Sequence, residues 1–174
     1  KTEFKLDFKA VDDGGKTSVI IVAAGSASRM GGVDKQLLKI GDTPVISRSI
    51  NAFSELDFID NIVVVTKKES VLEIQNLIKE YEALKVTDIV EGGDSRAQSV
   101  INGLTALSDD TGIVLIHDGA RPLVTPELIA KTVSAADFHG AAAPAIAVKD
   151  TIKNVQNHWV CGTPDRSSLR AVQT

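Results

Sequence analysis

The sequence predicts an α/β domain built on a mostly parallel sheet. Four short aliphatic segments, at residues 18–25, 61–66, 85–90 and 112–119, have the length and β-branched content of buried strands. Segments with a helical spacing of apolar residues separate them, and this alternation is typical of βαβ units. The chain has 174 residues, 43% of them hydrophobic, which is enough for one sizeable core. We therefore expect one domain.

Three helices have recognisable starts. Threonine followed by proline at residues 43–44 and again at residues 125–126 predicts an N-cap with proline in the first turn. Ser70, followed three residues later by Glu73, predicts a capping box. A fourth helix carries an apolar stripe that we expect to be buried, formed by Ala97, Val100, Ile101, Leu104 and Leu107.

The last third of the chain departs from this alternation. Residues 140–148 are small and apolar and predict a further buried strand. Residues 149–166 combine short strand-like pieces with turn formers and lack a long apolar stripe, so we expect a hairpin-like arm that leaves the core. Residues 1–17 precede the first predicted strand, and we expect them to be a leader or an appended segment, with the domain over residues 18–174.

Charge and composition exclude several classes of protein. The chain has 19 basic and 23 acidic residues, a net charge of −4, so no broad positive field exists to hold nucleic acid or an anionic membrane. No apolar run approaches the roughly 20 residues that a membrane-spanning helix needs. Cys161 is the only cysteine, which excludes an internal disulfide and fits a reducing compartment. We expect a cytoplasmic protein without nucleic-acid or membrane partners.

The first cluster of interest follows the first predicted strand, at residues 23–36 (AAGSASRMGGVDKQ). Small residues let consecutive backbone N–H groups surround phosphate oxygens, and Arg29 and Lys35 add positive charge. The Rossmann GxGxxG pattern and the P-loop pattern are both absent. The alternative is an ordinary glycine-rich connection with two solvated cations. The small residues are Ala23, Ala24, Gly25, Ser26, Ala27 and Ser28.

A second cluster, EGGDSRAQS at residues 91–99, follows another strand and opens a helix. Gly92 and Gly93 permit close backbone approach, and Asp94 or Ser95 can cap the helix. The helix N-terminus could then face a base or a ribose. Taken alone, the cluster is also compatible with a plain turn and cap.

A third cluster, HDGARP, ends the strand at residues 112–119. Asp118 is suited to Mg²⁺, and Arg121 can hold a phosphate group through two hydrogen bonds. His117 is interpreted as a structural hydrogen-bonding residue, since three scattered histidines do not predict a zinc site. The carboxyl ends of parallel strands meet at one edge of a sheet, so the three clusters should converge there. A nucleoside triphosphate, Mg²⁺ and an acceptor phosphate would suit this cavity, which indicates nucleotidyl transfer.

These motifs occur in a familiar order. AAGSASRMGG, DKQLL, EGGDSRAQSV, HDGARP, VKDTIK and TPDRSSLRAVQT together resemble the 2-C-methyl-D-erythritol 4-phosphate cytidylyltransferase family over residues 18–174. The resemblance implies a Rossmann-like three-layer sandwich with a mostly parallel twisted sheet and a protruding β-arm for dimerisation. It also implies transfer of CMP from CTP to methylerythritol phosphate, with release of pyrophosphate and with Mg²⁺ as cofactor.

The resemblance assigns roles to individual residues. Arg29 and Lys35 correspond to the catalytic pair, and the backbone of residues 23–28 corresponds to the triphosphate cradle. Asp118 would also bind the metal. The implied cytidine-binding residues are Gly92, Gly93, Asp94 and Ser99. The implied acceptor-binding residues are Asp118, Gly119, Arg121, Thr151, Arg166 and Thr174, with Thr151 and Arg166 on an arm that reaches a partner subunit.

Two departures and two alternatives accompany this interpretation. Family members continue beyond the position of Thr174, so part of the C-terminal region of the family domain is expected to be absent, and the first 17 residues exceed what the family needs. One alternative is a cytidylyltransferase for another polyol phosphate, such as ribitol 5-phosphate. The other is a nucleotide-binding fragment without activity. The pathway implies the bacterial cytosol or, in a plant or alga, a plastid.

Overall fold

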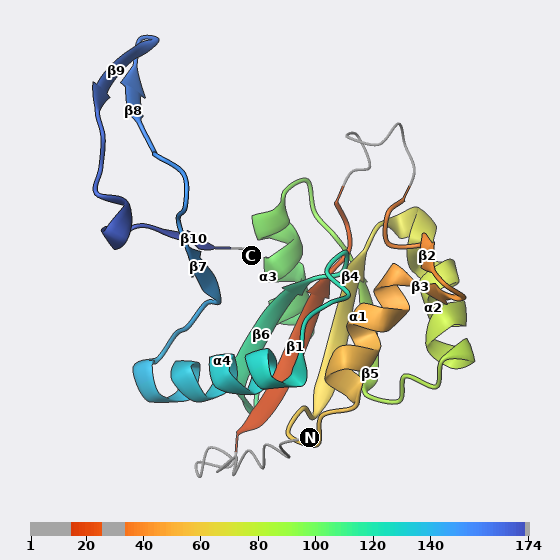
Figure 1. Ribbon diagram of the computed structural model, residues 1–174. Coiled ribbons are helices and arrows are strands. Elements are labelled where there is room, and N and C mark those ends of the chain that lie inside the picture. The colour runs from red at the N-terminus through yellow and green to blue at the C-terminus, as the bar shows by residue number, and fades with distance from the viewer. Residues whose placement is uncertain (1–14, 26–33, 173–174) are drawn as a thin grey trace.

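A four-stranded parallel sheet forms the centre of the protein, as the sequence predicts. The computed structural model describes residues 15–25 and 34–172 (Figure 1). The strands lie in the order β5, β4, β1, β6, and all three neighbouring pairs are parallel. Strand β1 begins at Lys16, so the last two residues of the segment 1–17 belong to the domain's first strand. The strands are β1 (Lys16–Val22), β4 (Asn61–Thr66), β5 (Val86–Glu91) and β6 (Thr111–Asp118).

Helices cover both faces of this sheet. The buried residues of α1 (Val45–Ser54), α2 (Val71–Glu80) and α4 (Pro126–His139) belong to one core cluster with one face of the sheet. Helix α3 (Arg96–Thr105) packs against β1, β4 and β5 on the other face. The two middle strands are inaccessible to solvent along most of their length, which explains why they are continuous aliphatic runs rather than alternating ones. The predicted three-layer α/β architecture is confirmed.

One of the three predicted helix starts is displaced by one residue, and a second, at Ser70, has the predicted position but lacks the predicted capping hydrogen bond. Thr43–Pro44 forms strand β3, which pairs with β2 (Lys39–Ile40), and α1 begins only at Val45. Ser70 ends a short 3₁₀ turn with φ −95° and ψ −6°, and its side chain makes no capping hydrogen bond. A capping residue needs extended backbone, which brings its hydroxyl to the free N–H groups, and Ser70 does not have it.

The third helix start is confirmed. The Thr125 hydroxyl accepts a hydrogen bond from the Leu128 N–H at 3.3 Å, with Pro126 as the first residue of α4. The helix ends at Gly140, whose φ of 84° lies in the left-handed region that glycine adopts without strain.

The apolar stripe of α3 is only partly buried, contrary to the prediction. Ile101 and Leu104 are 52% and 43% exposed, whereas Gly103 is buried against the sheet. A Cβ at Gly103 would lie 2.6 Å from Cγ2 of Ile20, so the helix approaches the sheet through a position that has no side chain. Helix α3 contacts β1, β4 and β5, and these contacts leave part of the stripe exposed.

The segment after α4 leaves the core. The expected strand at residues 140–148 is reduced to β7 (Ala145–Ala147), which is exposed rather than buried and pairs in antiparallel fashion with β10 (Arg170–Val172). Between them, β8 (Asn154–Gln156) and β9 (Trp159–Gly162) form a hairpin that projects away from the helices (Figure 1). The predicted arm is therefore present. Among the helices of the described residues, none has the length and apolar character needed to cross a membrane.

Candidate functional site

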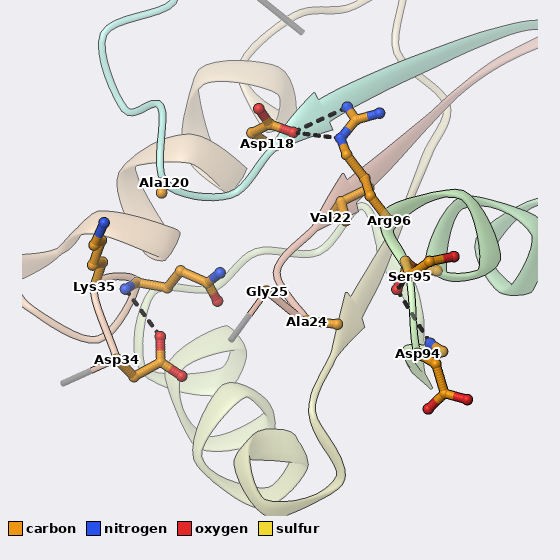
Figure 2. Close-up of a pocket in the computed structure, with 13 residues that line it drawn as sticks. Val22, Ala24, Gly25, Asp34, Lys35, Asp94, Ser95, Arg96, Asp118 and Ala120 are labelled. Carbon is orange, nitrogen blue, oxygen red and sulfur yellow. Dashed lines mark hydrogen bonds and ion pairs between the residues drawn. The ribbon is translucent and has the colours of Figure 1, made fainter. Parts of the chain in front are cut away.

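A cavity of about 620 Å³ opens at the carboxyl ends of the central strands (Figure 2). Residues from all three sequence clusters line it, so the predicted convergence on one edge of the sheet is confirmed. Figure 2 shows Asp34 and Lys35 across the cavity from Asp94 and Ser95. The lining residues are Val22, Ala24, Gly25, Asp34, Lys35, Gln36, Gly93, Asp94, Ser95, Arg96, Ser99, Asp118 and Ala120.

The end of β1 forms the floor. Ala24 and Gly25 line the cavity, whereas Ala23 is fully buried and its N–H donates to the Val65 carbonyl at 2.6 Å. Ala23 therefore extends the pairing of β1 with β4 and fixes the direction in which the chain leaves the sheet. Four predicted site residues, Ser26, Ala27, Ser28 and Arg29, lie outside the described residues.

Lys35 stands on the opposite wall, and the residue before it is well anchored. One carboxylate oxygen of Asp34 accepts from the Gln36 N–H at 3.2 Å, and the other lies 3.6 Å from the Lys67 ammonium group. Gln36 is buried, and its carbonyl accepts from the Ile46 N–H at 2.9 Å. The Lys35 side chain itself is exposed and lines the cavity. An exposed side chain is thus attached to a short segment that is held from both sides.

The wall formed by the second cluster is tightly constrained. The Gly92 N–H donates to the Thr66 carbonyl at 2.8 Å, and a Cβ at Gly92 would overlap the Cβ of Ala24. Only glycine therefore allows the end of β5 to come this close to the floor of the cavity. Gly92 does not line the cavity itself, but it brings Gly93 and Asp94 to the rim.

Ser99 and Ser95 fix the turn that follows. The buried Ser99 hydroxyl accepts from the Gly93 N–H at 3.1 Å and donates to the Ser95 carbonyl at 3.0 Å. The Ser95 hydroxyl accepts from the Gln98 N–H at 3.0 Å, so Ser95 rather than Asp94 caps α3. Both hydrogen bonds of the Ser99 hydroxyl go to backbone groups of this turn. Ser99 therefore lines the cavity and also fixes the backbone of its rim.

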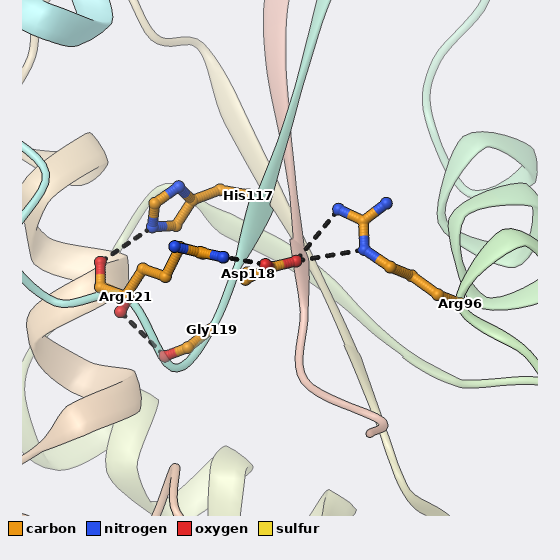
Figure 3. A network of polar contacts seen from close by, with 6 residues as sticks. Arg96, His117, Asp118, Gly119 and Arg121 are labelled. Atoms are coloured by element: carbon orange, nitrogen blue, oxygen red, sulfur yellow. Dashed lines mark hydrogen bonds and ion pairs between the residues drawn. The ribbon is translucent and has the colours of Figure 1, made fainter. Parts of the chain in front are cut away.

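Asp118 lies at the end of β6 between two arginines (Figure 3). Its Oδ1 accepts from Nε and Nη2 of Arg96, at 3.2 and 3.0 Å, and its Oδ2 accepts from Nε of Arg121 at 3.0 Å. Burial raises the pKa of the Asp118 carboxyl, but the hydrogen bonds from Arg121 and Arg96 and their positive charges outweigh burial, and the pKa is lowered. Asp118 is therefore a fixed carboxylate that faces the cavity.

His117 has the structural role that the sequence analysis assigned to it. Its Nε2 lies 3.0 Å from the Arg121 carbonyl, and its ring meets Phe53 edge to face with 4.9 Å between centroids. Burial lowers the pKa of the imidazole, although the Arg121 carbonyl and the Asp118 charge oppose that shift. The contact ties the loop after β6 to the end of the strand.

Four further predicted residues do not line the cavity: Gly119, Arg121, Thr151 and Arg166. Gly119 is buried, with its N–H donating to the Val22 carbonyl at 2.8 Å, and so supports the floor from behind. Thr151 and Arg166 are exposed on the arm, where Nη1 of Arg166 donates to the Lys149 carbonyl at 3.2 Å. Thr174 lies outside the described residues. Within one protomer, the arm residues and the cavity residues do not come together.

The sequence analysis missed several lining residues, of which Asp34 and Arg96 carry charge. Asp34 precedes Lys35, and an acidic residue beside a predicted catalytic lysine is a usable signal. Arg96 opens the helix after the glycine pair, a position that faces the same rim as Asp94. Its partner Asp118 is 22 residues away in sequence, so the contact requires the fold.

The donor set around Asp118 bears on the proposed metal. No group of three or more histidine, cysteine, aspartate or glutamate side chains able to hold an ion occurs in the part of the chain that the structure describes. Mg²⁺ commonly binds through one or two carboxylates and completes its coordination with water and substrate phosphates. Asp118, which has no cluster of further protein ligands around it among the described residues, fits that mode of binding and does not fit a metal held by protein ligands alone.

Comparison with known proteins identifies the family. Residues 17–174 match the 2-C-methyl-D-erythritol 4-phosphate cytidylyltransferase family. The enzyme of that name from Alkaliphilus oremlandii is 46% identical over 162 residues, which cover 91% of this chain and 69% of the relative. The one from Caldanaerobacter subterraneus is 44% identical over 160 residues, covering 90% and 70%.

Solved structures agree with this assignment. The crystal structure of 4-diphosphocytidyl-2C-methyl-D-erythritol synthase from Anaerococcus prevotii superposes with a TM-score of 0.83 at 32% identity, covering 96% of this chain and 71% of that one. The cytidylyltransferase from Thermus thermophilus gives a TM-score of 0.69 at 30% identity, covering 91% and 68%. On its motifs, its fold and these similarities, the chain belongs to the 2-C-methyl-D-erythritol 4-phosphate cytidylyltransferase family.

Proposed function

We propose that the cavity at the ends of β1, β5 and β6 is where this chain carries out the reaction of its family. As a member of that family the chain is a nucleotidyltransferase that transfers CMP from CTP to 2-C-methyl-D-erythritol 4-phosphate. The products are 4-diphosphocytidyl-2-C-methyl-D-erythritol and pyrophosphate. The observation that carries the assignment of the site is the convergence of all three sequence clusters on one cavity.

The reaction is an in-line substitution at the α-phosphorus of CTP. An oxygen of the acceptor phosphate forms the new bond to that phosphorus, and the bond to the bridging oxygen of the β-phosphate breaks, so pyrophosphate leaves with the electron pair. The acceptor phosphate is already ionised, so no general base is required. Negative charge grows on the α-phosphate oxygens, and fixed positive groups aimed at them lower the barrier.

The proposed roles follow the walls of the cavity. The backbone from Ala23 to Ser28 holds the triphosphate, and Arg29 and Lys35 stabilise the developing charge. Gly93 and Asp94 contact the cytidine, while Gly92 and Ser99 set the position of that rim. The lining by Ala24, Gly25, Lys35, Gly93 and Asp94 supports this division.

Asp118 and the loop after it form the proposed acceptor side. Arg121 holds the acceptor phosphate, and Gly119 supports the floor behind it. Asp118 would hold Mg²⁺ together with the triphosphate, and the ion would supply positive charge to the phosphate oxygens. The carboxylate kept ionised at the rim supports this role.

A homodimer is the proposed assembly. Thr151 and Arg166 would complete the acceptor site of a partner subunit through the arm, and Thr174 is a further proposed acceptor-binding residue. The hairpin supports this, because its apolar side chains are left in solvent within one protomer: Val155, Trp159 and Val160 are 61%, 79% and 62% exposed. We further propose a cytoplasmic location.

Pyrophosphate release tests the proposed function. The chain is incubated with CTP, Mg²⁺ and either methylerythritol phosphate or ribitol 5-phosphate, and pyrophosphate is measured with time. Release that depends on methylerythritol phosphate alone supports the assignment. Release with ribitol 5-phosphate alone identifies the other polyol phosphate as substrate, and CTP binding without release in either mixture identifies a nucleotide-binding fragment without activity.

A further inference from the structure

Arg96 joins two walls of the cavity that different strands supply. It is the first residue of α3, directly after the turn that follows β5, and it contacts the carboxylate at the end of β6. Two of its nitrogens, Nε and Nη2, approach the same oxygen, Oδ1 of Asp118 (Figure 3). Arg96, on the proposed nucleotide side of the site, thus holds Asp118, on the proposed acceptor side.

The backbone that carries Arg96 is rigid. Its neighbour Ser95 caps α3, and the Ser99 hydroxyl bonds both to the Gly93 N–H and to the Ser95 carbonyl. The first turn of α3 therefore holds the base of the Arg96 side chain in place. The exposed fraction of the side chain is 49% for Arg96 and 27% for Asp118, so the carboxylate is the more buried partner.

Asp118 in turn contacts Arg121, so a carboxylate held by Arg96 also fixes the position of the Arg121 side chain. While Oδ1 accepts from Arg96, Oδ2 accepts from Nε of Arg121 at 3.0 Å. A planar carboxylate held at both oxygens by planar guanidinium groups has a defined orientation. Without the Arg96 side chain, Oδ1 of Asp118 loses the hydrogen bonds from Nε and Nη2 of Arg96. The Asp118 carboxylate can then rotate about its Cβ–Cγ bond.

We propose that Arg96 is a positioning residue for the acceptor: it fixes the Asp118 carboxylate and, through it, the Arg121 guanidinium for binding of the acceptor phosphate. This inference rests on the proposed function of the cavity. Arg96 acts through Asp118 and does not itself contact the reacting phosphorus.

Steady-state kinetics of Arg96→Ala tests the proposal. Because a hydrogen bond to a charged group is lost, the KM for methylerythritol phosphate should rise by roughly tenfold or more, whereas the dissociation constant for CTP should change by less than about twofold. Arg96→Lys should recover only part of the loss, because an ammonium group cannot make the two-pronged contact. Thr105→Ala, at the exposed last position of α3, is the matched control and should leave both constants unchanged.

A double-mutant cycle with Asp118→Asn separates positioning from direct contact. If Arg96 acts through Asp118, adding Arg96→Ala to Asp118→Asn should cause little further loss. Fully additive effects, or a larger change for CTP than for the acceptor, would overturn the proposal. Thermal midpoints of all variants are measured in parallel, and Arg96→Gln replaces Arg96→Ala if the alanine variant unfolds. An inactive wild-type chain would instead refute the proposed function, and an active wild type with an unaffected Arg96→Ala would refute this inference alone.

Discussion

At the scale of single residues, Lys35 is the proposed catalytic side chain that the structure describes. Its neighbours fix its backbone through Asp34 and Gln36, while its own side chain remains exposed at the rim. This arrangement suits a lysine that interacts with the α-phosphate oxygens mainly as negative charge grows on them in the transition state. An interaction that is stronger in the transition state than in the bound substrate raises turnover.

Lys35→Ala should therefore lower turnover far more than it weakens CTP binding. Removing one preorganised positive donor of this kind costs roughly 100- to 1000-fold in kcat. The measurement is kcat from pyrophosphate release together with the CTP dissociation constant from calorimetry. Lys39→Ala, which removes a lysine from the short strand β2, is the control and should retain turnover. Near-normal turnover of Lys35→Ala would contradict the catalytic role.

At this scale the sequence correctly predicted that Ala24, Gly25 and Lys35 lie at one site, because they belong to one continuous segment and all line the cavity. Their roles in the reaction stay predictions.

The choice between Asp94 and Ser95 as the cap required the structure, since both residue types cap well. Ser95 has extended backbone, with φ −135° and ψ 163°, and its hydroxyl accepts from the Gln98 N–H. The contact between Arg96 and Asp118 joins two strand ends, and no local pattern reports it.

At the scale of helices and strands, the turn and cap before α3 determine the shape of one wall. Ser95 satisfies a backbone N–H in the first turn, and the same turn carries Gly93 and Asp94 to the rim. Stability of the helix start and geometry of the site are therefore linked.

Ser95→Ala should destabilise the protein by about 1 kcal/mol and weaken CTP binding as well. The stability loss is read from urea unfolding and the affinity from calorimetry. Thr125→Ala removes the corresponding cap of α4, which lies away from the cavity lining, and should cost a similar free energy without changing CTP affinity. Equal CTP affinity in both variants would separate the cap from the site and contradict this expectation.

The middle strands β1 and β4 were predictable because a strand buried on both faces must be a short aliphatic run. Strands β5 and β6 were predictable from their aliphatic content, although each is partly exposed. The departures at two helix starts have physical reasons. Thr43–Pro44 pairs with β2, so α1 begins one residue later than predicted. Ser70 does precede α2, but it lies in a 3₁₀ turn without the extended backbone that a capping hydroxyl needs. The segment at residues 140–148 has the composition of a buried strand, but β7 pairs only with β10 and stays exposed.

At the scale of the whole molecule, the chain combines a compact α/β core with an arm that packs little against it. The hairpin β8–β9 carries apolar side chains into solvent, and part of the apolar stripe of α3 is likewise exposed. Helical spacing reports which side of a helix is apolar, but it does not report whether a neighbouring element covers that side. The proposed dimer would cover the apolar residues of the hairpin.

Trp159→Ser should disrupt the dimer and raise the acceptor KM before it affects CTP. The indole is 79% exposed in one protomer, so its replacement removes apolar contact area from the arm without opening the core. Thr151 and Arg166 lie on the same arm, away from the cavity of their own protomer, and a monomer would therefore lack them at its acceptor site.

Sedimentation velocity and steady-state kinetics on the same samples check this prediction. Leu84→Ser is the control, because Leu84 is 91% exposed but lies before β5, far along the chain from the arm. The control should remain dimeric with an unchanged acceptor KM. The Trp159→Ser variant should sediment as a monomer, retain its CTP dissociation constant and need more methylerythritol phosphate to reach half-maximal rate. Full acceptor affinity in a proven monomer would show that one protomer contains the complete acceptor site, and the arm would then serve assembly alone.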